Sequence, residues 1–493
     1  MAVFDFKKTE ERIRHFWESE QIFEKSLELR SKEEHFVFFE GPPTANGLPH
    51  IGHFLTRVFK DLYGRYKTMR GYSVLRRAGW DTHGLQIEIE IEKELGFKNK
   101  KQIEEYGIAK FNQKAKENAK KYKGLWEQMT KRMGFWLDLH DPYVTYETSY
   151  IESVWNIIKT IWDKDLLYQA HRVVPFCTRC GTGLSSHEVA QGYKLVKENS
   201  VYLKFKLTKN DKFSENTFIL AWTTTPWTLP GNVALAVGKD IRYVKIKPKD
   251  SEETYILAKD LLLKVFPQFD GAELGFIDGN DLVGLEYEPL FDVSQLKSEK
   301  SYHIYAAPFV STTDGTGVVH TAVMYGEDDY ALSTELGLPK VHTVDLQGKF
   351  IGVSSDLDGM YVKTAKTTEV ILAKLKATGT LFKEEEYEHD YPFCWRCDTA
   401  LIYYSKTSWF IKMSAVNKQL LKNNDQINWI PSHLKEGRFG QWIKEGKDWA
   451  FSRERYWGTP LPVWQCANAD CETYRVAGSL DDLKKNRFKK PNE

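Results

Sequence analysis

Two pairs of cysteines have the spacing most specific for chemistry in this chain. Cys177 and Cys180 form one CxxC motif, and Cys394 and Cys397 form a second. Each motif can bring two thiolates to one ion, so the four side chains predict a tetrahedral zinc site. A thioredoxin-like redox pair and simple buried thiols are the alternatives. Redox chemistry is disfavoured because both pairs lie in turn-like runs, PFCTRCGTG and PFCWRCDTA, and neither opens a helix after a strand.

Two histidines at the predicted start of a helix are candidates for phosphate binding. His50 and His53 follow the turn GPPTANGLP, and apolar residues then keep helical spacing as far as Arg70. A helix N-terminus offers free N–H groups and partial positive charge, which favour phosphate. Two imidazoles one turn apart can also donate to a phosphoryl group as its charge rises. Alone, the tetrapeptide HIGH is better explained as two surface histidines, but the turn before it and the helix after it favour function.

The sequence around these histidines predicts a parallel βαβ unit that would position them. An apolar run of strand length, HFVFFE, precedes the turn, and a second short strand is expected over residues 72–75. Parallel strands place their carboxyl ends at the same edge of a sheet, where open α/β sheets bind ligands. The turns at 41–43 and 79–81 are therefore expected to lie side by side.

The remaining chain predicts helices followed by a β-rich region. Helices are expected over 8–29 and over most of 100–170. From about 198 to 385, short β-rich runs alternate with turn residues, which indicates a compact β-barrel-like domain. The acidic stretch 383–390, KEEEYEHD, is expected to be a solvated connector. The CxxC pairs bracket this domain, so one ion would join its first and last strands, and the chain divides into 1–197, 198–385 and 386–493.

Composition sets the outer limits of the interpretation. The chain has 493 residues, 42% of them hydrophobic and 28% charged, which predicts a soluble globular protein of two to four domains. A net charge of +1 shows no global basic field, although a local Lys/Arg face would cancel in the sum. No apolar signal core opens the chain, and no stretch approaches the ~18 apolar residues of a membrane helix. We expect a cytoplasmic protein with no membrane partner.

The segment GPPTANGLPHIGH is similar to the ATP-binding signature of the class I aminoacyl-tRNA synthetases. Together with the segments below, it makes the chain resemble the N-terminal portion of the isoleucyl-tRNA synthetases. The resemblance implies that ATP, as its Mg complex, is bound by Pro43, Thr44, Asn46, Gly47, His50, Gly52 and His53.

A second segment, GWDTHGL (79–85), resembles the one in which the isoleucine enzymes hold the ammonium group of the amino acid. By that match Asp81 would bind the ammonium, and Gly41 and Pro42 would line the pocket. A turn or N-cap aspartate is the alternative for Asp81. Family members usually have proline where this chain has Gln86, so the loop departs from the family pattern at this position.

Three further stretches extend the resemblance over nearly the whole chain: CTRCGTGLSSHEVAQGY (177–193), SWFIKMS (408–414) and DWAFSRERYWGTPLP (448–462). The first resembles the zinc knuckle that leads into the family's insert, and the other two resemble the return from it. The implied fold is α/β, with a Rossmann-like parallel-sheet catalytic domain that is interrupted by the β-barrel-like editing insert and lacks its C-terminal part.

Within the insert, WTTTPWTLPGN (222–232) and GTGVVHTAVMYGEDD (315–329) resemble the two halves of an editing site. The resemblance implies that an aspartate holds the ammonium of a wrongly attached amino acid, while threonines and a histidine surround its ester and the terminal ribose. These residues are Asp329, Thr223, Thr224, Thr225 and His320. A Thr-rich β-strand is the alternative, although two prolines make this run a poor strand. The family commonly has other residues at Val323, Met324 and Tyr325.

There is a physical reason why an enzyme for isoleucine would need an editing site in addition to its activation site. One methylene is worth about 1–3 kcal/mol in an apolar pocket, a limit for which isoleucine against valine is the standard illustration. A smaller competitor fits any pocket built for isoleucine, so a second, hydrolytic site must remove the error. Ester hydrolysis needs a positioned water and donors to the developing oxyanion, which hydroxyl groups can supply.

The implied function is ATP-dependent attachment of isoleucine to tRNA(Ile) through isoleucyl-adenylate, with hydrolysis of mischarged valyl-tRNA. The run WTTTPWTLPGN together with GWDTHGL favours isoleucine over valyl and leucyl relatives, in which an arginine tends to stand at the position of Thr225. The full-length protein is expected to be a monomer whose partners are tRNA(Ile), isoleucine and ATP, with zinc as its metal.

The last part of the sequence lacks one expected feature. After Cys466 and Cys471, which offer half of a second metal site at best, we find no KMSKS-like lysine loop. We therefore expect a partial enzyme that forms little adenylate by itself. Two alternatives remain at this point: a deacylase that only edits, and a non-catalytic fragment that binds tRNA or a partner and contains a structural zinc.

Overall fold

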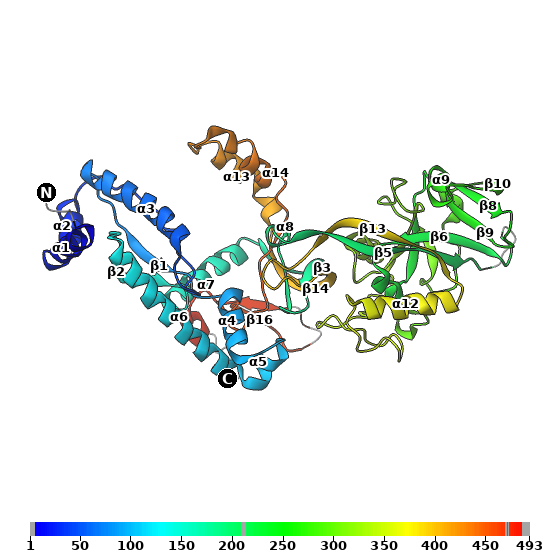
Figure 1. The fold of residues 1–493 in the computed structure, drawn as a ribbon, viewed down its shortest axis with the longest axis horizontal. Coiled ribbons are helices and arrows are strands. Elements are labelled where there is room, and N and C mark those ends of the chain that lie inside the picture. The colour runs from blue at the N-terminus through cyan, green and yellow to red at the C-terminus, as the bar shows by residue number, and fades with distance from the viewer. Residues whose placement is uncertain (1–4, 209–212, 469–470, 472, 486–493) are drawn as a thin grey trace. The chain divides into compact units, whose positions relative to one another are not determined.

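The computed structural model describes residues 5–208, 213–468, 471 and 473–485, and the chain divides into two compact units (Figure 1). The first unit comprises residues 1–167 and 455–493, and the second comprises residues 168–454. The first unit is thus built from two stretches that flank the second in sequence. Within the described ranges, no helix has the length and apolarity needed to cross a membrane.

The first unit is mostly helical around a short parallel sheet. Strand β1 pairs in parallel with β2, and the chain between them forms three helices, as a parallel connection requires. Its elements are α1 (Phe6–Ser19), α2 (Ile22–Leu29), α3 (Ile51–Met69), β1 (Arg77–Trp80), α4 (Leu85–Leu95), α5 (Lys101–Tyr106), α6 (Ile108–Arg132), β2 (Asp138–Val144), α7 (Thr148–Asp163), β16 (Val463–Gln465), β17 (Tyr474–Val476) and α15 (Leu480–Lys485).

Two predicted elements of this unit differ from the structure. The helix expected over 8–29 is two helices, because Gln21 takes a left-handed conformation (φ 50°) between α1 and α2. The strand expected over 72–75 is found at 77–80. Its pairing with β2 begins only there, with Arg77 opposite Asp138, the first residue of β2. The helix predicted after His50 is confirmed as α3.

The apolar run before the turn lies parallel to the chain that follows α3. Isolated parallel bridges join His35 to Ser73 and Thr44 to Asp81, one near each end of the run. The segments before and after α3 therefore run parallel to each other, as the sequence predicts. No continuous ladder joins them between residues 36 and 43.

The core of the first unit joins its two stretches of chain. Ile87 and Ile91 on α4 pack with Phe111 and Ala115 on α6, and each pair is spaced by one helical turn. Trp457, which follows the second unit in sequence, belongs to the same cluster. The loop after β1 and the segment at 456–457 are therefore held together by a shared core.

The described residues of the second unit form three sheets. A six-stranded sheet has the order β10-β8-β9-β6-β5-β13, a three-stranded sheet has the order β11-β7-β12, and a four-stranded sheet has the order β15-β14-β3-β4. Its strands are β3 (Leu167–Cys177), β4 (Thr182–Gly183), β5 (Tyr193–Lys206), β6 (Thr217–Thr223), β7 (Ala234–Val237), β8 (Arg242–Pro248), β9 (Thr254–Ala258), β10 (Gly271–Asp278), β11 (His303–Ala306), β12 (Val318–Thr321), β13 (Leu381–Pro392), β14 (Ile402–Ile411) and β15 (Trp449–Ala450).

Short helices connect these strands. The α-helices are α8 (Ser186–Ala190), α9 (Leu262–Val265), α10 (Gly279–Leu282), α11 (Glu327–Leu336), α12 (Ala365–Ala377), α13 (Asn417–Asn424) and α14 (Arg438–Lys444), and the 3₁₀ turns are η1 (Pro226–Gly231), η2 (Lys259–Leu261), η3 (Ser294–Leu296), η4 (Met413–Ala415) and η5 (Ser432–Leu434). The prediction of short strands between turn residues in this region is confirmed, with β5 to β8 as its first four strands.

Two expectations for the second unit need correction. The six-stranded sheet is open, because its edge strands β10 and β13 do not pair with each other, so the described residues form a mixed α/β fold and no closed barrel. The acidic stretch 383–390 is not a connector: it lies in β13, which runs antiparallel to β5 along its whole length (Figure 1). Its acidic residues are tolerated there because they face cations, as in the pairs of Lys376 with Glu384 at 2.5 Å and of Lys197 with Glu386 at 3.3 Å.

Candidate functional site

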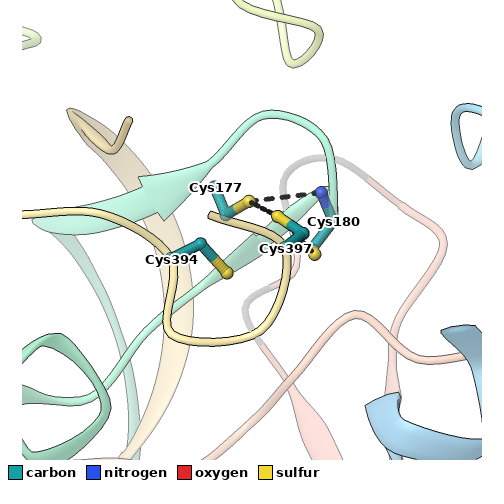
Figure 2. A group of neighbouring side chains, drawn as sticks. All are labelled: Cys177, Cys180, Cys394 and Cys397. Carbon is teal, nitrogen blue, oxygen red and sulfur yellow. Dashed lines mark hydrogen bonds between the residues drawn. The ribbon is translucent and has the colours of Figure 1, made fainter. Parts of the chain in front are cut away.

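Four cysteines come together at the ends of two strands in the second unit. Cys177 ends β3 and Cys180 follows it in the turn to β4, while Cys394 and Cys397 follow β13 (Figure 2). Their sulfur atoms all lie within 4.8 Å of one another, and Cys397 Sγ lies 3.4 Å from the Sγ atoms of both Cys177 and Cys180. Four sulfurs around Zn²⁺ at about 2.3 Å stand roughly 3.8 Å apart, so the cluster fits this ion.

The turn chemistry of the two knuckles explains why the thiols converge. Each turns through a residue in the left-handed region, Gly181 (φ 61°) and Asp398 (φ 59°). In the second knuckle Asp398 N donates to Cys394 O and Cys394 N donates to Thr399 O, both at 2.8 Å. Hydrogen bonds from the two thiols of the first knuckle lower the pKa of Cys394.

In the first unit, His50 is the N-cap of α3, and the two histidines cap the helix reciprocally. His50 Nδ1 accepts from Gly52 N at 3.2 Å, and His50 N donates to His53 Nδ1 at 3.1 Å. The imidazole rings lie 3.7 Å apart, and His53 packs edge-on against Trp126. Partial burial, with the positive charges of His50 and Arg57, lowers the pKa of His53. The two imidazoles therefore stand where the helix N-terminus favours an anion.

The turn before α3 contacts the carboxyl end of β1. Thr44 Oγ1 donates to Asp81 Oδ2 at 3.0 Å, and Asp81 N donates to Pro43 O at 3.1 Å. Asn46 Nδ2 donates to Gln86 Oε1 at 2.8 Å, so the glutamine that replaces the family's usual proline joins the two loops. The structure thus brings the expected ATP-binding and amino-acid-binding segments side by side. Two more of the expected residues, Gly47 and Gly41, are also held by hydrogen bonds. Trp126 Nε1 donates to Gly47 O at 2.9 Å, and Lys60 Nζ donates to Gly41 O at 3.0 Å.

The sequence reasoning missed two residues beside this loop, Glu88 and Trp457. The carboxylate of Glu88 is fully buried, and its Oε1 accepts from Tyr456 N at 2.6 Å and from Trp457 N at 2.9 Å. Lys100 pairs with the same carboxylate. Trp457 Nε1 in turn donates to Thr82 O at 2.5 Å. The sequence does contain a sign that Glu88 is buried: it lies on the same helical face as Ile87 and Ile91, where only apolar residues are expected.

Replacing Glu88 with alanine is expected to destabilise the first unit by about 3 kcal/mol, because it leaves two backbone N–H groups without their acceptor and leaves Lys100 only the longer pair with Glu92 at 3.7 Å. Urea unfolding followed by tryptophan fluorescence measures the change. The matched control is Glu90→Ala on the same helix, since Glu90 makes only a 3.6 Å pair with Lys93 and should cost less than about 0.5 kcal/mol. Equal effects of the two substitutions would contradict this account.

The threonine run of the second unit is not a strand. Strand β6 ends at Thr223, and the 3₁₀ turn η1 begins at Pro226. Thr225 Oγ1 lies 3.2 Å from Thr223 Oγ1 and 3.4 Å from Thr228 Oγ1, and Thr228 Oγ1 lies 2.9 Å from His320 Nε2. A continuous chain of hydroxyl groups therefore ends on the histidine. The sequence reasoning missed Thr228, although it follows the TTT run by one helical turn.

The two titratable residues of this site have shifted pKa values. Burial lowers the pKa of His320 to about 4, so its ring is neutral near pH 7. Asp329, in the first turn of α11, accepts from Ala322 N at 3.0 Å, which places its carboxylate at the end of the strand that contains His320. Desolvation raises the pKa of Asp329 to about 6, and an ammonium group beside it would lower that value.

The pKa of His320 predicts a dependence of stability on pH. Its pKa is lower in the folded chain than the ordinary 6.5, so its contribution is complete above pH 6.5 and declines as the pH falls towards 4. Between pH 7 and pH 5, the loss from this one group is about 2 kcal/mol. Urea unfolding at both pH values should show a loss smaller by this amount in His320→Gln, which keeps a hydrogen-bonding side chain. The same loss in both proteins would rule out His320 as the cause.

The residues that depart from the family pattern lie under the threonine run. Val323, Met324 and Tyr325 are all buried. Tyr325 packs edge-on against Trp227 in η1, with the ring centroids 5.2 Å apart, and Thr343 N donates to its hydroxyl at 2.7 Å. Tyr325 therefore supports η1 through its contact with Trp227. Thr224 faces elsewhere and lines a cavity of about 330 Å³ together with Trp227 and the start of α12.

The chain is similar to known proteins over almost its whole length. The profile of the family described as tRNA synthetases class I (I, L, M and V) matches residues 12–493. The isoleucine–tRNA ligase of Clostridium novyi is 50% identical over 489 residues, and that of Bacillus thuringiensis (strain Al Hakam) is 48% identical over 484 residues. These alignments cover 99% and 98% of this chain but 46% of each relative, so the chain spans about half the length of the curated relatives it matches.

A solved complex of the LeuRS of Agrobacterium radiobacter K84 with tRNA aligns with 97% of this chain and 52% of its own, at 15% identity and a TM-score of 0.39. That likeness is too weak to support a statement about the fold. The family match covers nearly every residue, and the HIGH-bearing helix and the threonine run both lie inside it. The chain belongs to the class I tRNA synthetases for isoleucine, leucine, methionine and valine.

Proposed function

We propose that this chain is the part of an isoleucine–tRNA ligase that holds one half of the activation site and the whole editing site. The observation that carries the proposal is the hydrogen-bonded chain from Thr223 to His320, together with the carboxylate of Asp329, which accepts from Ala322 N two residues after His320. The 47–50% identity to isoleucine–tRNA ligases supports the choice of amino acid.

The first unit would bind the reactants of amino-acid activation. In that reaction a carboxylate oxygen of isoleucine attacks the α-phosphorus of ATP, and pyrophosphate leaves. Free N–H groups at the start of α3, with His50 and His53, would stabilise the charge that develops on the phosphates. Asp81 would hold the ammonium of isoleucine, and Thr44, which already donates to Asp81, would fix the orientation of its carboxylate. Mg²⁺ would arrive with ATP as part of the substrate.

The second unit would hydrolyse the ester of a mischarged tRNA. Asp329 would hold the ammonium of valine, and the hydroxyls of Thr223, Thr225 and Thr228 would donate to the ester and orient a water. The water adds to the ester carbonyl, the ribose oxygen leaves with a proton, and the products are free valine and tRNA. Neutral His320 suits this work because it can accept or donate a hydrogen bond without bringing charge into the site.

The cysteine cluster would hold a structural zinc. Four thiolates complete a tetrahedral shell and leave no position for substrate, so catalysis by this ion is not proposed. Within the 168–454 unit, we propose residues 198–385 as the editing domain, with the metal joining the chain where β5 begins and β13 ends.

The test is release of valine from valyl-tRNA(Ile) by the purified chain, followed as loss of acid-precipitable radioactivity. We expect hydrolysis well above the spontaneous rate, together with little ATP–pyrophosphate exchange on isoleucine. Hydrolysis no faster than in buffer would contradict the editing assignment. Strong exchange by the chain alone would contradict the assignment of half an activation site.

A further inference from the structure

His320 makes a hydrogen bond through each of its two ring nitrogens, and both partners are buried. Its Nε2 lies 2.9 Å from Thr228 Oγ1, and its Nδ1 lies 3.4 Å from Asn232 Nδ2. Because burial lowers the pKa of His320 to about 4, the ring carries a single N–H near pH 7 and must place it on one of the two nitrogens. The partner of Nδ1 therefore decides what Nε2 can do.

The amide of Asn232 has one orientation that satisfies its neighbours. Its Nδ2 lies 3.0 Å from Ala234 O, and a carbonyl oxygen can only accept, so the NH₂ group faces that side. Its Oδ1 accepts from the hydroxyl of Tyr287 at 2.7 Å. The second N–H of the NH₂ group is then left for His320 Nδ1, which must accept it. The proton of the ring is therefore on Nε2.

Tyr287 is packed so that its hydroxyl stays beside Asn232. Its ring packs edge-on against Phe205 and Tyr302, with the centroids 5.2 and 6.0 Å apart, and Tyr287 N donates to Tyr302 O at 3.0 Å. Burial raises the pKa of Tyr287 well above its ordinary value, so the hydroxyl keeps its proton and can donate. Tyr287 is thus a fixed donor to an amide that lies 55 residues away in the sequence.

The tautomer of His320 determines what the hydroxyl of Thr228 can do. With the proton on Nε2, the ring donates to Thr228 Oγ1, and the hydrogen of that hydroxyl stays available; in this structure it is donated to Thr225 O at 2.8 Å. With the proton on Nδ1, Nε2 would accept the same hydrogen, and an ester bound in the site would lose one donor.

We infer that Tyr287, acting through Asn232, holds His320 as the tautomer with its proton on Nε2. Tyr287 is then a positioning residue for the editing reaction, because it keeps the hydroxyl of Thr228 able to donate to the ester. This role in hydrolysis rests on the proposed function, whereas the tautomer does not depend on it.

The test compares Tyr287→Phe with the matched control Tyr302→Phe. Each removes one buried phenol hydroxyl, but that of Tyr302 has no hydrogen-bond partner among the described residues. In the full chain labelled with ¹⁵N-histidine, two-bond ¹H–¹⁵N correlation spectra show which ring nitrogen carries the proton, and His320→Gln identifies the signals of His320. We expect the proton on Nε2 in the native chain and in the control, and both tautomers in Tyr287→Phe. Asn232→Asp sets an acceptor opposite Nδ1 and should place a proton there.

The rate of deacylation of valyl-tRNA(Ile) is the second readout. Asp329 would still hold the ammonium, so Tyr287→Phe should leave KM within about twofold and lower kcat by about tenfold. The loss is smaller than for removal of an oxyanion donor, because part of the protein keeps the original tautomer. Tyr302→Phe should change neither constant. A residue that only stabilises the fold would lower the melting temperature without dividing kcat from KM in this way.

A native chain with the proton on Nδ1, or a Tyr287→Phe variant with the native tautomer, would overturn the inference. An altered tautomer with an unchanged kcat would overturn the role of Tyr287 in hydrolysis, because Thr228 would then act independently of His320. If the native chain hydrolyses no ester, the proposed function and that role fail together, while the spectra still decide whether Tyr287 sets the tautomer.

Discussion

Cys180→Ser is expected to remove the metal from the chain and to destabilise the second unit by about 4–5 kcal/mol, the range that marks the loss of a structural metal. The native protein should contain one zinc per chain, and the variant close to none. The reason is geometric: Cys180 and Cys397 come from knuckles 217 residues apart, and the ion bonds both. Without the ion, no metal–sulfur bonds join the turn after β3 to the turn after β13. Metal analysis and urea unfolding measure both effects.

Cys466→Ser is the matched control for that substitution. Cys466 is exposed and lies outside the four-cysteine cluster, so its replacement should change neither metal content nor stability. A native chain without zinc, or a Cys180→Ser variant that keeps both its metal and its stability, would show that these residues are buried thiols. A reversible gain of two electrons with no metal bound would favour the redox alternative.

Asp329→Ala is expected to lower kcat/KM for deacylation of valyl-tRNA(Ile) by roughly 30- to 1,000-fold. Removing one partner of a desolvated charge pair costs about 2–4 kcal/mol, and the substrate's ammonium would lose its only proposed counter-charge. The side chain also accepts from Ala322 N, so some local loosening at the end of β12 is expected. Deacylation rates across a range of substrate concentrations separate weaker binding from slower hydrolysis.

The neighbouring Asp328 provides the control for this prediction. It has the same charge on the same helical turn, but it is exposed and enters the site only through its Coulomb effect on Asp329. Asp328→Ala should therefore keep at least half of the native activity. If both substitutions reduce deacylation equally, the acidic side chains in the first turn of α11 act as a general field and Asp329 has no specific role. Unchanged activity in Asp329→Ala would remove it from the site altogether.

The features that the sequence predicted well depend on short-range patterns. The start of α3 follows from a Gly/Pro turn before helical spacing, and strands β5 to β8 follow from short apolar runs between turn residues. The gathering of the four cysteines follows from the two CxxC motifs, since each fixes the direction of two thiols within one turn.

The features that the sequence did not predict depend on a partner far along the chain. Residues 383–390 look like a solvated linker because they are acidic, and only pairing with β5 makes them a strand. Glu88 looks like one more surface charge in IEIEIEKEL, and only the arrival of Tyr456 and Trp457 makes it a buried acceptor. Gln86 is similar, since its contact with Asn46 depends on how two loops meet.

We propose that the second unit contains a complete hydrolytic site for the wrong amino acid. The most direct test is to measure, in parallel, the rates at which the purified chain deacylates valyl-tRNA(Ile) and isoleucyl-tRNA(Ile). The account predicts fast release of valine and release of isoleucine near the spontaneous rate, because the site must reject the larger side chain. Equal rates for the two esters, or no hydrolysis of either, would contradict it.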